Sequence, residues 1–461
     1  MTDFLNRPGE PRGLCSQLHW LRGGLSRPTV ARLATWCVLA GLSLPAAWAD
    51  TATAIKAIQQ VSAEGKGAAE ATAAYRELAG GSGESLPALL SALDAANPLA
   101  ANYLRNAIEV VVDRALDGNQ PLPEKAIEAF LADRRHDARA RRLAFEILVD
   151  INDKNRDRLI PGFLDDPSVE LRRDAVAQVL GQAETQLKAG QKDEAKSLFG
   201  KAMTAARDDD QVQLCRKQLG ELGVTVDLPR HFGFVMNWKL IAPFDNTEKK
   251  GFAVAYPPEK ELDFTKEYPS KEEGVMARWT DGSTEDEYGI VDVAKLLMPW
   301  KGAVAYAAAE FDSPAERAID IRLGTPNSWK VWLNGELLFA REEYHRGMSL
   351  DQYRMRGKLK AGKNTILIKL CQNEQTEEWA QRWQFQLRVC DATGTAVLSA
   401  DRKPAPAATG SDWPGPTGSS PAAHPASQPG PPPDPETTTP PRPLAAAPFS
   451  TRPLLTLPAV P

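Results

Sequence analysis

The feature that most constrains the fold of this chain is a change of hydrophobic period near residues 223–232. Upstream, from Asp50 to about Gly223, apolar residues recur at spacings of three and four, which is typical of amphipathic helices. Downstream of Pro229, apolar and polar residues alternate, which is typical of strands with one buried face. Because one segment cannot satisfy both periods, the sequence predicts a helical region followed by an antiparallel strand region.

The helical region contains an internal similarity. An arginine followed by an alanine two residues later and then an apolar residue occurs at 105–108, 142–145 and 173–176, at intervals of 31 to 37 residues. Phe-Leu-x-Asp segments at 130–133 and 163–166 precede the last two copies. A period of this length predicts helix pairs that bury a continuous core only by stacking on their neighbours.

Two segments of this region resemble known repeats. Residues 163–176 resemble a HEAT repeat, in which the turn at Asp166 and Pro167 starts the second helix. Residues 183–202 resemble one tetratricopeptide-type (TPR-like) hairpin, with Gly190 closing its first helix. The resemblances imply an α-solenoid over residues 50–223 whose surface binds a protein partner. An irregular helical array outside the named families is the alternative.

The alternating pattern of the strand region predicts a β-sandwich over residues 232–402. Its cleanest strands, at 319–323 and 383–389, are apolar on one face and polar on the other. Asn334-Gly335 supplies the two positive φ angles of a type I′ hairpin turn, and residues 360–364 form another turn. Roughly ten short strands at this spacing favour two packed antiparallel sheets.

The second half of this region resembles a galactose-binding-like jelly roll. Residues 329–336, then Leu359, Gly362, Asn364 and the apolar run 366–368, are similar to the sugar-binding domain of family 2 glycoside hydrolases. The resemblance implies a jelly-roll fold and a sugar ligand, although hairpin geometry alone accounts for the Asn-Gly and Gly-x-Asn elements. Residues 232–300 join the domain by strand pattern only, and no segment is long enough to be the hydrolase barrel.

The predicted ligand-binding residues are aromatic and polar side chains on and after this hairpin. Flat rings cover the apolar face of a pyranose while polar neighbours meet its hydroxyl groups. The predicted set is Trp329, Trp332, Tyr344, His345, Arg346 and Tyr353. The alternative is that the tryptophans pack between the sheets and that residues 344–353 form an ordinary surface loop.

The sequence offers no catalytic, metal or cofactor motif. The acidic stretch 281–287 lacks the ligand spacing of a calcium loop and is read as a solvated loop. His136, His231 and His345 fall in separate regions, and no Gly-x-Ser-x-Gly segment is present, so neither a zinc site nor a triad can be assembled. We therefore expect a non-catalytic protein without metal or cofactor.

The N-terminal residues predict export. Arg27 and Arg32 precede an apolar run at 33–44, and small residues surround a cleavage point after Ala49. This order predicts a signal peptide within residues 1–49, with a start that is over-extended and translation beginning near Val30. An uncleaved segment, which would bring the chain to a membrane, is the alternative.

Cysteine usage after cleavage leaves two readings open. Cys371 and Cys390 each close a predicted strand, so an oxidising compartment permits a disulfide between them, while two buried free thiols are equally compatible. Cys215 has no obvious partner.

Residues 403–461 hold about half of the 36 prolines and are predicted to be a disordered tail. The expected fold class is thus multidomain α + β: a solenoid of helix pairs, a jelly-roll β-sandwich and a Pro-rich tail. A net charge of −5 gives no basis for nucleic-acid binding.

The expected function is that of an exported scaffold, with a protein partner on the solenoid and a glycan or second protein on the sandwich. An enzyme of polysaccharide turnover and a ligand-free component of the cell envelope are the alternatives.

Overall fold

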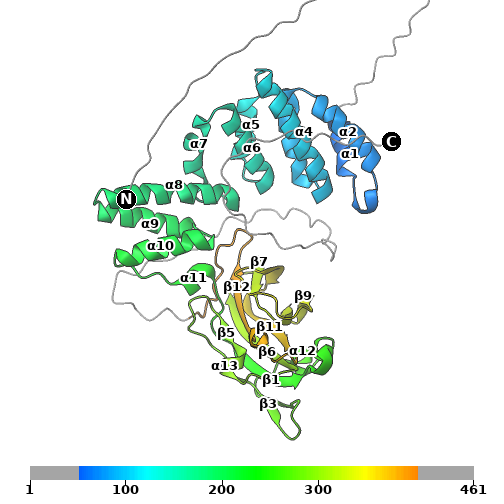
Figure 1. Cartoon of the computed structure of the whole chain (residues 1–461), viewed down its shortest axis with the longest axis vertical. Helices are drawn as coiled ribbons and strands as arrows, with labels where there is room; N and C mark the ends of the chain where they lie inside the picture. The colour runs from blue at the N-terminus through cyan, green and yellow to red at the C-terminus, as the bar shows by residue number, and fades with distance from the viewer. Residues whose placement is uncertain (1–50, 403–461) are drawn as a thin grey trace, which may run out of the picture.

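The computed structural model describes residues 51–402 and combines helices with antiparallel sheets (Figure 1). The predicted signal peptide and the Pro-rich tail lie outside the described residues. Eleven helices occupy the first half: α1 (Thr51–Gln59), α2 (Ala68–Gly80), α3 (Leu86–Ala92), α4 (Pro98–Asp117), α5 (Glu124–Ala132), α6 (Ala138–Ile151), α7 (Lys154–Leu159), α8 (Val169–Lys188), α9 (Lys192–Ala205), α10 (Asp209–Glu221) and α11 (Leu228–Phe232).

The two longest helices, α4 and α8, begin at side-chain caps. The Oδ1 atom of Asn97 accepts hydrogen bonds at 3.0 Å from the amides of Leu99 and Ala100, which starts α4. Ser168 caps α8 in the same way, so the helix begins two residues after Pro167 rather than at the Asp-Pro turn that the sequence predicts. The proline therefore lies in the turn, where it needs no amide donor.

Arginines of the similar segments connect alternate helices along the chain. Arg105 on α4 forms an ion pair with Glu146 on α6 at 3.9 Å, Arg142 on α6 pairs with Asp174 on α8, and Arg173 on α8 pairs with Asp210 on α10 at 2.6 Å. The alanines two residues after these arginines are fully buried. In Figure 1 these helices lie one beside the next along the upper part of the molecule.

The helical region has two hydrophobic clusters. The first extends from α1 to the start of α8, and the second combines α8 to α11 with residues up to Phe234. Arg141 of α6 donates two hydrogen bonds of 2.7 Å to the carboxylate of Asp166, which lies just before α8. Both side chains are 1% exposed. A buried pair of this kind is stable only while both partners are present.

The second half of the described chain consists mainly of antiparallel sheets. A six-stranded sheet has the order β4-β1-β6-β11-β8-β9, a four-stranded sheet has the order β10-β7-β12-β5, and β2 pairs with β3. The strands are β1 (Lys239–Asp245), β2 (Glu267–Pro269), β3 (Met276–Arg278), β4 (Thr280–Asp281), β5 (Val291–Asp292), β6 (Ala303–Ser313), β7 (Arg317–Gly324), β8 (Ser328–Leu333), β9 (Glu336–Arg341), β10 (Tyr353–Leu359), β11 (Gly362–Gln372) and β12 (Gln384–Cys390); the short helices α12 (Pro257–Lys260) and α13 (Val293–Leu296) interrupt them.

The two larger sheets share one hydrophobic core. Alternate residues of β6, β7, β11 and β12 meet in a single cluster, as the two-residue period predicts. The Asn-Gly hairpin prediction is confirmed, because Asn334 and Gly335 have φ angles of 53° and 82° and connect β8 to β9. The outer face of the six-stranded sheet carries a second cluster, covered by residues 252–279.

The cysteines within the described residues are free and buried. Cys371 lies on β11 of the six-stranded sheet and Cys390 on β12 of the four-stranded sheet, so the reading with free thiols applies. Burial raises the pKa of Cys371 to about 12 and that of Cys390 to about 11, which keeps both thiols protonated and unreactive. Within residues 51–402, no helix has the length and apolar character needed to cross a bilayer.

Candidate functional site

Three loops meet at one end of the six-stranded sheet. They follow β1, β9 and β11 and comprise residues 246–252, 342–352 and 373–383, which we call the loop cluster. Asn246 joins them, because its Nδ2 donates to the carbonyl oxygen of Gln372 at 3.0 Å and to the Tyr344 hydroxyl at 3.2 Å. Asn246 is fully buried, so its side-chain amide holds the first loop against the second loop and against the end of β11, where the third loop begins.

The first loop is a tight turn. Glu248 and Lys249 have φ angles of 55° and 62°, and a Cβ atom on Gly251 would lie 2.2 Å from the carbonyl oxygen of Asp245. The Glu248 amide donates to the Glu374 carboxylate of the third loop. The turn also brings the Lys249 ammonium group to 5.3 Å from the centre of the Tyr344 ring.

The aromatic side chains of the cluster come from the second and third loops. His345, with a φ of 57°, places Nε2 2.7 Å from Oδ1 of Asn373, and its ring meets Trp379 edge to face at 5.1 Å. Trp379 is 60% exposed, the largest value among the large hydrophobic side chains of residues 51–402. Burial raises the pKa of the neighbouring Tyr344 to about 12, so its hydroxyl stays protonated and able to donate.

This arrangement suits a neutral polar ligand that has an apolar face. Trp379 offers a flat ring to solvent, while amide side chains and the Tyr344 hydroxyl supply donors and acceptors nearby. A Trp ring left in water without a packing partner on its outer face is costly, and covering it is favourable. Within the described residues, no group of three or more His, Cys, Asp and Glu side chains could hold a metal ion.

The structure separates the predicted ligand-binding residues into two sets. Tyr344 and His345 belong to the loop cluster, and the exposed Arg346 beside them forms an ion pair with Glu343 at 3.4 Å. Trp332 is 8% exposed and lies in the outer hydrophobic cluster that Tyr344 also contacts.

Trp329 and Tyr353 lie elsewhere. Trp329 is fully buried in the core between the sheets, 4.7 Å from the Tyr353 ring. The expectation that Trp329 contacts a ligand is therefore corrected, and the alternative of core packing describes it. Tyr353 opens β10 and covers this buried ring, so we leave both residues out of the site.

Trp379 is not among the residues that the sequence predicts to bind a ligand. It lies in η6 (Glu378–Ala380), a single turn between two strands, directly after a pair of glutamates that would be read as surface charge. The available signal was an aromatic residue inside a polar segment without strand period, since such a segment has no core to bury it in.

The acidic stretch 281–287 has a structural partner. Glu287 forms an ion pair with Arg216 of α10, and the Tyr288 hydroxyl donates to Asp209 at 2.6 Å. The acidic side chains of the stretch are exposed, as expected for a solvated loop, and its end contacts the helical region.

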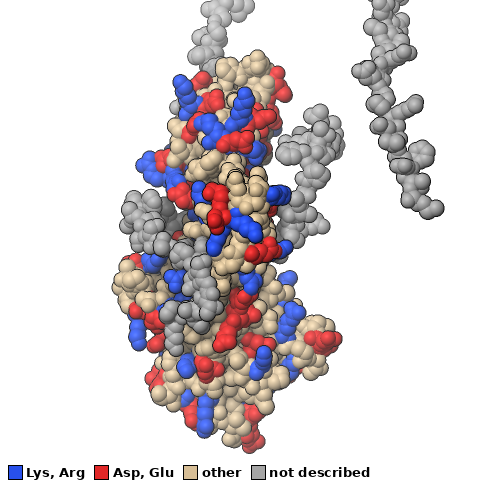
Figure 2. Space-filling model, turned by 90° about the vertical axis from the view of Figure 1, so that its left-hand side faces the viewer, with Lys and Arg blue, Asp and Glu red and all other residues tan. Residues whose placement is uncertain are grey.

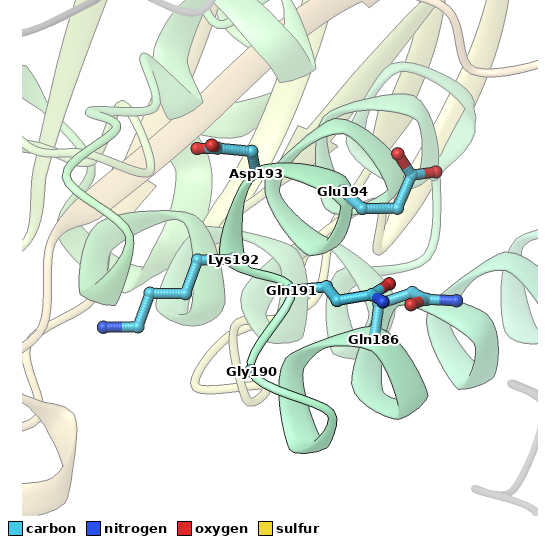
Figure 3. A pocket seen from close by; sticks show the side chains of 6 residues that line it. All are labelled: Gln186, Gly190, Gln191, Lys192, Asp193 and Glu194. Atoms are coloured by element: carbon cyan, nitrogen blue, oxygen red, sulfur yellow. The ribbon is translucent and has the colours of Figure 1, made fainter.

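Two hollows elsewhere lack the features of a ligand site. The depression in the turn between α8 and α9 is lined by Gln186 and residues 190–194, whose charged side chains point away from one another (Figure 3). A groove of about 840 Å³ lies between residues 233–239 and 397–402. Of its four aromatic residues, Phe234, Trp238 and Phe311 are at most 3% exposed. The fourth, Phe264, is partly buried and meets the Trp279 ring edge to face at 5.2 Å, so no fully exposed ring lines the groove.

Charged side chains of both signs are mixed on one face of the molecule. On the face shown in Figure 2, basic and acidic residues are interspersed over both regions.

Of the remaining histidines in the described part of the chain, His136 binds Asp94 at 2.7 Å. His231 is buried with Nε2 3.1 Å from the carbonyl oxygen of Ala206, so neither approaches the loop cluster.

No protein-family model and no curated protein matches the chain. Among solved structures, it is similar over short stretches to a beta-glucosidase from Kluyveromyces marxianus in complex with glucose (13% identity, 19% of this chain and 11% of that one, TM-score 0.16). Others are an anti-sigma factor domain-containing protein (12%, 38% and 51%, TM-score 0.17) and a GH31 alpha-xylosidase from Xanthomonas citri (11%, 22% and 13%, TM-score 0.13). The chain thus spans about a tenth of the glucosidase and half of the anti-sigma factor protein, and superpositions this partial carry no argument about activity.

Proposed function

We propose that this chain is an exported, non-catalytic binding protein whose loop cluster binds a glycan and whose helical region binds a protein partner. The observation that carries the proposal is the exposed ring of Trp379, which meets His345 edge to face, while the ring of Tyr344 lies 6.3 Å from that of His345. Stacking on such a ring gives affinity, and hydrogen bonds from the neighbouring amides give orientation.

The finer description of both regions belongs to the same proposal. We infer a HEAT-like and TPR-like solenoid for residues 50–223, supported by the arginines that pair each second helix with the next. For residues 232–402 we infer a galactose-binding-like jelly roll, supported by the two sheets that share a core and by the Asn-Gly hairpin. An extended array of helices leaves much surface open to a protein partner.

The test is glycan binding by the purified full chain. On a glycan array, we expect binding to a defined sugar class that weakens at least about tenfold in Trp379→Ala and in Tyr344→Ala. Leu337→Ala is the matched control, because Leu337 is 49% exposed on β9 and lies outside the loop cluster. A folded protein that binds no glycan would favour a protein scaffold or a ligand-free envelope component.

Two further measurements address the other parts of the proposal. Release of reducing ends from a polysaccharide panel would show an enzyme of polysaccharide turnover and contradict the non-catalytic assignment. Export is tested by fractionating cells that express the full chain and sequencing the N-terminus of the product. We expect mature protein beginning at Asp50 outside the cytoplasm, whereas an uncleaved chain in the membrane fraction would contradict cleavage.

A further inference from the structure

The second loop of the cluster links the candidate glycan site to the helical region. It carries Tyr344 and His345 near its start, and Leu350 near its end packs on the hydrophobic cluster of α8 to α11. Between them the backbone passes close over β7, where a Cβ atom on Gly324 would lie 2.5 Å from the carbonyl oxygen of Ser349. The loop is therefore confined along its length.

The end of this loop is held by a buried charged group of three residues. Asp351, which has a φ of 56°, accepts hydrogen bonds of 2.6 Å from Nε and Nη2 of Arg388 and from Nη1 of Arg322. Arg388 and Arg322 are 2% and 6% exposed. Burial alone would raise the pKa of Asp351, but the two arginines outweigh it and hold that pKa below its ordinary value.

The same group reaches the helical region. Nη1 of Arg388 donates to the carbonyl oxygen of Phe232, the last residue of α11, at 3.1 Å, and the guanidinium lies 5.6 Å from the centre of the Phe232 ring. Arg388 also belongs to β12 and Arg322 to β7. Asp351 is consequently the point at which the second loop, the four-stranded sheet and α11 are joined.

We propose that Asp351 is a positioning residue for the loop cluster: it holds residues 342–350 so that His345 lies against Trp379 and Tyr344 against Asn246. The proposal rests on the proposed glycan-binding function. Ordering an eleven-residue loop costs conformational entropy, and a site whose loop is already fixed binds without that cost. The loop has weaker internal supports, among them the hydrogen bond of 2.7 Å from Gln352 Nε2 to the carbonyl oxygen of Gly347.

The test uses Asp351→Asn in the full chain with a panel of soluble hexasaccharides of glucose, xylose, mannose and galactose. We expect the hexasaccharide that binds the unmodified protein most tightly to lose affinity at least about tenfold, although Asp351 does not touch the aromatic residues. Amide hydrogen exchange within residues 342–350 should accelerate at least about tenfold while exchange in β6 and β11 stays unchanged.

The matched control is Asp320→Asn. Asp320 also binds Arg322, at 3.3 Å, but it lies within β7 and not in the loop. An equal loss of affinity in Asp320→Asn, or unchanged affinity and loop exchange in a folded Asp351→Asn, would overturn the proposal. If Asp351→Asn does not fold, Gln352→Ala tests the loop by the same two readouts.

The two proposals fail differently. If the unmodified protein binds none of the hexasaccharides, the glycan function fails, and hydrogen exchange in residues 342–350 still decides whether Asp351 holds the loop. If glycan binding is present and is lost in Trp379→Ala but not in Asp351→Asn, the function stands and the positioning role fails.

Discussion

The helical and strand regions use charged residues in different ways. In the helical region most ion pairs lie on the surface between neighbouring helices, as with Arg173 and Asp210, whose side chains are 43% and 64% exposed. The strand region also has exposed pairs, such as Lys358 with Glu316, but it buries several charges that bind partners far away in the sequence. Lys369 is fully buried and donates to Glu259 and to two backbone carbonyls more than 110 residues away. Exposed pairs contribute little to stability, whereas a buried charge needs every partner in place.

This difference predicts which substitutions should destabilise a few neighbouring elements and which should destabilise a whole region. In the helical region the helices contact mainly their neighbours along the chain, so damage should spread over the few helices around the substituted residue. The sheets share a single core between strands far apart in sequence, so damage there should reach all of them. The predictions below test this contrast, starting with the largest expected effect.

The largest effect is expected in the shared core. Trp329→Ala removes a fully buried ring and should lower the free energy of unfolding of the strand region by about 3–5 kcal/mol. Chemical denaturation followed by tryptophan fluorescence measures it, with Phe339→Ala, at 46% exposure on β9, as the control. If amide hydrogen exchange in the variant accelerates in β8 alone, that result would contradict a cooperative core.

Next comes the buried ion pair of the helical region. Arg141→Met leaves the Asp166 carboxylate buried without its two hydrogen bonds and should cost about 3 kcal/mol. Amide hydrogen exchange should rise in α5 to α8 and remain unchanged in the sheets. Equal acceleration in β6 and β11 would show that the two regions unfold as one unit and would break the comparison.

A smaller effect on the free energy of unfolding is expected when the pH is lowered, because of the buried His231 on α11. Burial lowers the pKa of His231 from its ordinary 6.5 to about 3, so the folded protein keeps this side chain neutral while the unfolded chain binds a proton. The stability that depends on it is therefore present above pH 6.5 and is lost as the pH falls toward 3, about 2 kcal/mol of it by pH 5. His231→Gln should flatten this part of the profile of unfolding free energy against pH, and an unchanged slope would contradict it.

The smallest effect is expected at the exposed contact between the regions. Removing the pair between Arg216 and Glu287 by Glu287→Gln should change the free energy of unfolding by less than about 1 kcal/mol, because both side chains are well exposed. A thermal melt in low and in high salt measures it. A larger loss would show that this exposed contact contributes more than its exposure indicates, and would weaken the contrast with the buried group around Asp351.

The sequence predicted the elements better than the site. The helical and alternating periods gave the correct order of helices and antiparallel strands, and Asn334-Gly335 gave its hairpin, because these depend on neighbours in sequence. Of the residues predicted to bind a ligand, Tyr344 and His345 lie in one loop of the cluster, while Trp329 is buried in the core. An alternating strand has two faces, and sequence alone does not say which face meets the second sheet.

The spacing of contacts explains the rest. In the helical region the similar segments recur every 31 to 37 residues, and ion pairs form across the same separation, as between Arg134 and Asp165 or Arg173 and Asp210. The helical period in the sequence therefore accounts for the order of the helices, because it depends on residues close together in the chain. The contacts of Asn246 with Tyr344 and of His345 with Trp379 depend on the tertiary structure. Strand pairing in the six-stranded sheet brings together loops that carry no common period, and Asn246 and Trp379 are 133 residues apart.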